Sequence, residues 1–199
     1  MDWWINMITF RNFINEAKDK TAVFAFGRMN PPTTGHGKLI KKVMSVAKSE
    51  RGMPMVFPSK TEDNKKNPLT YRTKVKVLRD VFGSIINTSM DIKTPFDVLD
   101  YLNKKKFSKV VFVVGSDRVI EFKKNMSKYV ESDLTNIKDF SVASAGDRDP
   151  DAEGVKGISG SKMREYVKKD KFKKFASGLM TKNSKLAKQV FKELQKRMK

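Results

Sequence analysis

Apolar and polar residues follow one another along this chain in blocks that predict strands and helices in turn. Short apolar runs at residues 21–27, 53–57 and 109–114 have the length and composition of buried strands. Between these runs, apolar residues recur every three or four positions, as on one face of an amphipathic helix. The helices expected from this spacing cover residues 34–49, 70–81, 95–105, 117–129, 160–167 and 181–198.

Two further strands are expected at residues 84–89 and 140–143. Strands that alternate with helices imply parallel pairing with right-handed crossovers. We therefore predict an α/β fold: a Rossmann-like, doubly wound, parallel five-stranded sheet with helices on both faces. The expected organisation is an apolar N-terminal extension at 1–18, a main domain at 19–170, and a basic helical tail at 171–199 that packs on the domain.

Composition narrows the chemistry that this chain can perform. The 199 residues include no cysteine and one histidine. The absence of cysteine excludes a disulfide and a thiolate nucleophile, and the single histidine argues against a histidine-based zinc site. No apolar run approaches the roughly 20 residues of a membrane-spanning helix, and the start lacks the features of a signal peptide. We expect a cytoplasmic protein with no membrane partner; a homo-oligomer is possible.

The chain is strongly basic, with 42 Lys and Arg against 22 Asp and Glu and a formal charge of +20. Such a field attracts polyanions, so nucleic acid is a possible partner. The competing interpretation is a solvated surface, because most of these cations are lysines dispersed along the predicted helices.

Four loops follow strands of the predicted sheet, at residues 27–37, 58–68, 115–118 and 144–161. Ligands of such sheets bind beyond the carboxyl ends of the strands. The first of these loops holds the single histidine, His36, at the start of a helix. Free backbone N–H groups and the helix dipole suit an anion such as phosphate there. A histidine that only caps the helix is the alternative.

The residues of these loops resemble the motifs of the small nucleotidyltransferases. Residues 30–36, N-P-P-T-T-G-H, resemble the H/T-x-G-H motif, and residues 158–164, I-S-G-S-K-M-R, resemble the second motif, I-S-x-[ST]-x-x-[RK]. The nicotinamide-nucleotide branch is similar at G-R-M-N-P (27–31), N-P-L-T (67–70) and G-S-D (115–117). P-S-K at 58–60 looks like the phosphopantetheine adenylyltransferases.

This resemblance covers roughly residues 20–168. It implies transfer of AMP or CMP from a nucleoside triphosphate to a small phosphorylated acceptor, with release of pyrophosphate and with nicotinamide mononucleotide as the leading acceptor. It also implies Mg²⁺, held mainly by the substrate phosphates. The chain also looks like cytidylyltransferase-like proteins of tailed bacteriophages, which would place it in the host cytoplasm. The alternative is a basic nucleic-acid-binding or phage assembly protein that keeps the fold.

The resemblance assigns catalytic roles to His36, Thr33, Lys60 and Arg164. His36 would donate to the triphosphate, and Lys60 would approach the α-phosphate on a loop where Lys65 or Lys66 could replace it. Helix capping is the alternative role for Thr33 and for the serines. The nucleotide-binding residues expected are Phe26, Gly27, Arg28, Met29, Asn30, Gly35, Gly115, Asp117, Ile158, Ser159 and Ser161.

Overall fold

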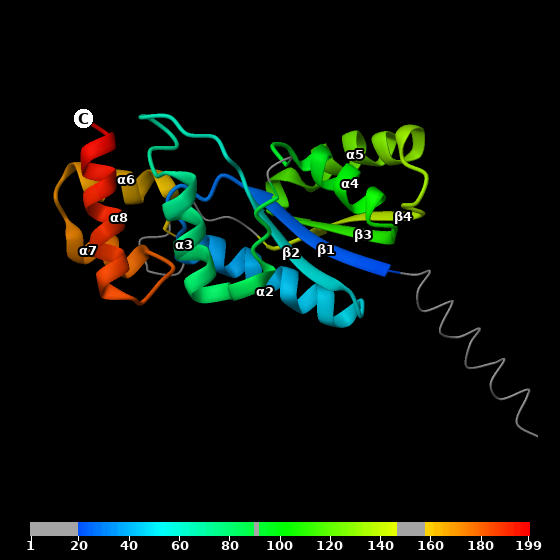
Figure 1. Cartoon of the computed structure of the whole chain (residues 1–199), viewed down its shortest axis with the longest axis horizontal. Coiled ribbons are helices and arrows are strands. Elements are labelled where there is room, and N and C mark those ends of the chain that lie inside the picture. The colour runs from blue at the N-terminus through cyan, green and yellow to red at the C-terminus, as the bar shows by residue number, and fades with distance from the viewer. Residues whose placement is uncertain (1–19, 90–91, 147–157) are drawn as a thin grey trace, which may run out of the picture.

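The computed structural model describes residues 20–89, 92–146 and 158–199, and its centre is one parallel sheet (Figure 1). The strands β1 (Lys20–Gly27), β2 (Met53–Pro58), β3 (Phe107–Val114) and β4 (Asp139–Ser144) pair in the order β2-β1-β3-β4. The expected extension at 1–18 and residues 147–157 of the fourth loop lie outside the described residues. The predicted α/β fold with helices on both faces is confirmed.

Over the described residues the sheet has four strands, so the fifth strand expected at residues 84–89 is wrong. Gly83–Ile85 instead form a 3-10 turn, η1, and Ile86 makes one isolated bridge with Val56. Gly83 ends the preceding helix at a φ of 57°, a left-handed conformation that glycine adopts readily. Ile86 is buried, so the apolar signal came from packing against the core rather than from a ladder of strand pairs.

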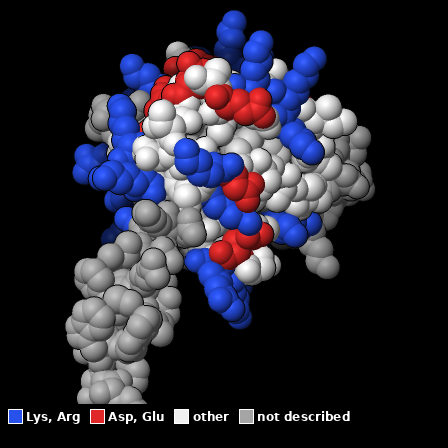
Figure 2. All heavy atoms as spheres, turned by 90° about the vertical axis from the view of Figure 1, so that its right-hand side faces the viewer, with Lys and Arg blue, Asp and Glu red and all other residues white. Residues whose placement is uncertain are grey.

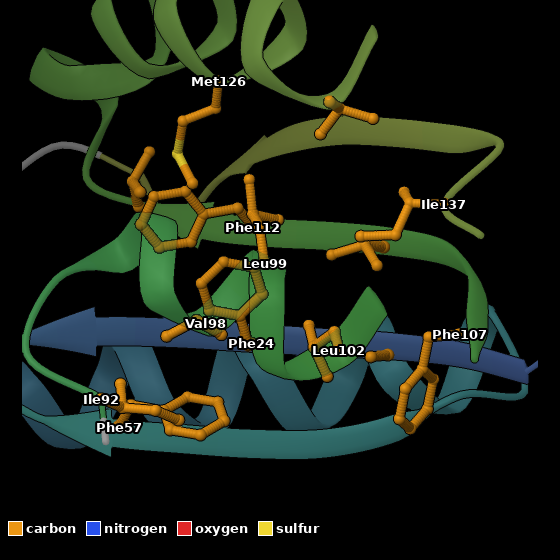
Figure 3. Packing of buried hydrophobic residues seen from close by; sticks show 14 residues of the cluster. Phe24, Phe57, Ile92, Val98, Leu99, Leu102, Phe107, Phe112, Met126 and Ile137 are labelled. Atoms are coloured by element: carbon orange, nitrogen blue, oxygen red, sulfur yellow. The ribbon is translucent and has the colours of Figure 1, made fainter. Parts of the chain in front are cut away.

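Helices cover both faces of the sheet because successive strand residues point to opposite sides. Val23 and Ala25 of β1 face the helix α2 (Thr34–Ser49). Phe24 faces the other side, which is covered by α4 (Pro95–Lys104) and α5 (Val119–Asp133). There the rings of Phe24 and Phe112 stack with their centroids 4.4 Å apart (Figure 3). A short 3-10 turn, η2 (Ser116–Arg118), precedes α5.

A second cluster of helices lies beyond the carboxyl ends of the strands (Figure 1). It consists of α6 (Gly160–Lys168), α7 (Phe172–Gly178) and α8 (Ser184–Arg197), which pack with α3 (Tyr71–Phe82). The pattern did not predict α7, and α8 begins later than expected because Asn183 caps it. Within the three described stretches of chain, no helix has the length and apolar content needed to cross a bilayer.

Candidate functional site

Thr33 and His36 form a reciprocal cap at the first turn of α2. The hydroxyl oxygen of Thr33 accepts from the backbone N–H of His36 at 3.4 Å, and His36 Nδ1 accepts from the backbone N–H of Thr33 at 3.0 Å. A backbone N–H can only donate, so Nδ1 is the acceptor and the proton of the neutral ring is on Nε2. The capping role given above as the alternative for Thr33 is present, and the Thr33 N–H fixes the tautomer of His36.

Asn30 joins the loop after β1 to the loop after β2. Its Nδ2 donates to the carbonyl of Leu69 at 2.8 Å, and its Oδ1 accepts from the Leu69 N–H at 2.9 Å. The side chain is only 4% exposed. Beside it, buried Met29 has a φ of 44°, a conformation that non-glycine residues rarely adopt. The double hydrogen bond therefore holds a strained loop in one place.

Arg164 of α6 reaches the same loop. Its Nη1 donates to the Asn30 carbonyl at 2.8 Å, and its Nη2 donates to the Ser161 hydroxyl at 3.0 Å. Gly160 opens the helix, and Ser159 caps it by accepting from the Lys162 N–H at 3.2 Å. A Cβ on Gly160 would lie 3.2 Å from the Asn30 carbonyl oxygen, so glycine is what lets α6 come this close.

The two helix starts share one hollow of about 250 Å³. Both helix dipoles place their positive ends there, which favours an anion. Among the described residues that line it, three side chains are cationic, and they come from three segments far apart in the sequence. The lining residues are Arg28, Met29, Asn30, His36, Lys66, Asn67, Ser159, Gly160, Ser161 and Arg164.

Arg28 lies near enough to Arg164 in this hollow to disfavour its charge. In the described part of the protein neither Arg28 nor Arg164 forms a salt bridge. Burial, and then the nearby Arg28 cation, lower the pKa of the Arg164 guanidinium, while Asp63 opposes this shift. A bound anion would relieve this effect on Arg164, because a phosphate can accept hydrogen bonds from both guanidinium groups.

Asp63 organises the turn that brings Lys66 and Asn67 to the hollow. Its carboxylate accepts from the backbone N–H groups of Lys65 at 2.8 Å and Lys66 at 2.5 Å, and from the side-chain amide of Asn67 at 2.5 Å. These hydrogen bonds hold the pKa of Asp63 well below its usual range. The turn that carries Lys66 and Asn67 is therefore held in place by an ionised aspartate.

Seven of the expected site residues line this hollow, and the others do not. Lys60 has its Nζ 5.8 Å from the centre of the Tyr71 ring and is not among the lining residues; Lys66 is. Gly115 and Asp117 lie after β3 and do not line it either. The remaining expected residues are close in sequence to residues that line the hollow. Phe26 and Gly27 end β1, and Thr33 and Gly35 are at the start of α2. Buried Ile158 precedes α6.

Sequence reasoning missed two lining residues, Gly160 and Asn67. Gly160 stands inside the second motif, but only the approach of α6 to Asn30 shows why it must be small. Asn67 was noted only as part of N-P-L-T. A polar residue directly before a proline, after a polar loop, was the signal available.

Residues 24–182 match the sequence model of the family described as Cytidylyltransferase-like. A search of curated proteins finds no match.

Solved structures share the fold at low sequence identity. A protein described as a candidate nicotinate-nucleotide adenylyltransferase from Vibrio parahaemolyticus is 15% identical, with a TM-score of 0.54 over 86% of this chain and 98% of its own. The Plasmodium falciparum nicotinic acid mononucleotide adenylyltransferase, complexed with APC or with NaAD, is 12% identical, with a TM-score of 0.56 over 87% of this chain and 95% of its own.

Proposed function

Because the chain belongs to the cytidylyltransferase-like family, we propose that it transfers AMP or CMP from a nucleoside triphosphate to a small phosphorylated acceptor and releases pyrophosphate. One observation carries this proposal: His36 and Arg164, from opposite halves of the chain, line one cationic hollow with Arg28 and Lys66. A site for a triphosphate and a second phosphate needs several cations and helix starts that converge.

In the proposed reaction a phosphate oxygen of the acceptor attacks the α-phosphorus of the triphosphate. The bond from the α-phosphorus to the bridging oxygen breaks, and pyrophosphate leaves with the electron pair. The acceptor phosphate is already ionised near neutral pH, so the protein needs no nucleophile of its own. Its task is to position two anions and to stabilise the charge that develops between them.

His36 suits that task because of its tautomer. With Nδ1 accepting from the Thr33 N–H, the Nε2–H is the group that can donate to the triphosphate as negative charge builds. Arg164 and Ser161 would bind the β- and γ-phosphates at the start of α6, and Arg28 and Lys66 would hold the other phosphates. Nicotinamide mononucleotide is the leading acceptor, on the strength of the motifs at 27–31, 67–70 and 115–117.

Mg²⁺ is part of this proposal as a charge-neutralising partner of the bound phosphates. In residues 20–89, 92–146 and 158–199 no group of three or more His, Cys, Asp or Glu side chains could hold a metal ion. The oxygens of a triphosphate, with water, are ligands that Mg²⁺ accepts in place of a protein cage. The side chains of this hollow would then bind the phosphate oxygens that the ion leaves open.

The test is pyrophosphate release from each of the four nucleoside triphosphates with a panel of phosphorylated acceptors that includes nicotinamide mononucleotide. We expect release only when a triphosphate and an acceptor are both present. His36→Ala should lower turnover by about 10²–10³. No release with any pair, from folded protein, would overturn the proposal.

His36→Gln separates catalysis from capping. Glutamine is a usual partner at this position of a capping box, so its side-chain oxygen can still accept from the Thr33 N–H. It has no imidazole Nε2–H. We expect His36→Gln to unfold at the wild-type temperature and to stay impaired in turnover. A fully active His36→Gln protein would show that the ring only caps the helix.

A further inference from the structure

The outer face of α8 carries a row of four lysines. Lys185, Lys188, Lys192 and Lys196 are all exposed. At 100° and 1.5 Å per residue they lie within an arc of about 80° and extend over about 16 Å. No salt bridge in the described stretches of chain involves any of them. We call these four residues the lysine stripe.

The apolar residues and the one acidic residue of α8 make contacts within the protein. Its apolar residues are buried against α6, α7 and α3. Its one acidic residue, Glu193, accepts from the Thr70 N–H at 2.9 Å and from the Thr73 hydroxyl at 2.6 Å, and so caps the start of α3. The helix therefore has no carboxylate of its own that neutralises the stripe.

A hollow of about 520 Å³ between α3 and α8 extends the cationic area. It is lined by Arg72, Thr73, Lys76 and Gln189, and Lys76 Nζ donates to Gln189 Oε1 at 3.1 Å. On a helical wheel Gln189 neighbours Lys185 and Lys192. Arg72 and Lys76 thus lie beside the lysine stripe, which gives one surface with six cations.

The end of the molecule opposite α8 has a different distribution of charged side chains. There acidic side chains are interspersed among the cations (Figure 2). Lys109, for example, pairs with Glu50 at 2.8 Å and with Asp139 at 3.4 Å. Lys109 at that end is therefore paired with acids, whereas no salt bridge among the described residues involves the stripe.

We propose that the lysine stripe, with Arg72 and Lys76, binds the phosphate backbone of duplex nucleic acid without reading its bases. Evenly spaced cations along a rigid rod match a repeating line of phosphates. The stripe has no aromatic side chain on which the bases of a single strand could stack. A membrane is disfavoured because an interfacial helix needs an exposed apolar face, and the apolar face of α8 is in the core.

The experiment is fluorescence anisotropy of a labelled 20-base-pair DNA duplex over a range of salt concentrations. The stripe variant changes Lys185, Lys188, Lys192 and Lys196 to Gln. The control changes the exposed lysines Lys104, Lys123, Lys124 and Lys128 to Gln, which removes the same charge from α4 and α5. With five or six phosphates contacted, log K should fall with log salt with a slope of about −4.5 to −5.4 in the wild type.

In the stripe variant we expect weaker binding and a slope reduced in magnitude by about 3.6, while the control keeps both within error. Pyrophosphate release should be unchanged in both variants, so this result does not depend on the proposed catalytic function. Equal losses in both variants would show a diffuse charge effect and overturn the proposal. Tighter binding to phosphatidylserine vesicles, or to a single strand of the same length, than to the duplex would overturn it as well.

Discussion

Arg164 Nη1 donates to the carbonyl oxygen of Asn30 at 2.8 Å, although 134 residues separate the two in the chain. Asn30 is in turn bonded twice to Leu69. A single chain of hydrogen bonds therefore runs from α6 through the loop after β1 to the loop after β2. Parts of the hollow that come from three regions of the sequence are held in one arrangement before any ligand is bound.

Replacing Arg164 with Lys tests whether this arrangement matters for activity. A lysine keeps the charge, but its ammonium cannot hold the Asn30 carbonyl and the Ser161 hydroxyl in the planar geometry of a guanidinium. We expect turnover to fall at least tenfold, with little change in thermal unfolding. Steady-state kinetics and circular dichroism measure the two effects. If Arg164→Lys has wild-type kinetics, the planar guanidinium that holds Asn30 and Ser161 is not needed for activity.

Asn30→Ala should destabilise the protein. It leaves the buried N–H and C=O of Leu69 without partners, at a cost of about 1–3 kcal/mol for each group. We expect the free energy of unfolding to fall by about 2–4 kcal/mol in urea denaturation. Asn136→Ala is the control, since that exposed side chain also donates to a carbonyl, of Asn103 at 3.1 Å. Its effect should stay within about 0.5 kcal/mol; equal effects would refute the argument.

The parallel sheet and the positions of both motifs could be predicted from the local pattern. A buried strand and a capped helix both depend on residues that are close together in the sequence. The local pattern could not predict that Lys66, and not Lys60, lines the hollow. This difference depends on the hydrogen bonds of Asp63, which turn the loop so that Lys66 meets the hollow while Lys60 lies near Tyr71. The supposed strand at 84–89 failed for a related reason, since buried Ile86 looks the same in sequence whether it pairs or only packs.

Gly160→Ala and Gly37→Ala form a matched pair of substitutions near the starts of two helices. We expect Gly37→Ala to raise stability and Gly160→Ala to impair activity. A Cβ on Gly37 meets nothing closer than 3.9 Å, so alanine should stabilise α2 by about 0.5–1 kcal/mol. A Cβ on Gly160 would lie 3.2 Å from the Asn30 carbonyl oxygen and 3.3 Å from Arg164 Nη1. We expect Gly160→Ala to lower turnover, because α6 must shift away from the hollow. Thermal unfolding and pyrophosphate release, measured on both variants, check the pair.

Lys74 gives the protein a dependence of stability on pH. Its side chain is fully buried, and its Nζ donates to the carbonyl of Ser59 at 2.5 Å. Burial lowers the pKa of Lys74 to about 8, and the Glu62 carboxylate opposes this shift. The same amine is near the ring of Tyr71, whose pKa burial raises. Below pH 8 the folded protein therefore holds a charge that the unfolded chain accommodates more easily.

The sign of the pH effect follows from proton binding. Between pH 8 and about 10.5 the unfolded chain keeps a proton on Lys74 that the folded protein has lost, so the contribution of Lys74 to stability rises with pH there. The rise totals about 3 kcal/mol at most. Lys74→Met removes the ionisable group, so the difference in unfolding free energy between this variant and the wild type should shift by that amount across the window. Urea denaturation at pH 7, 9 and 10.5 measures it, and a constant difference would show that the Lys74 ammonium is not desolvated.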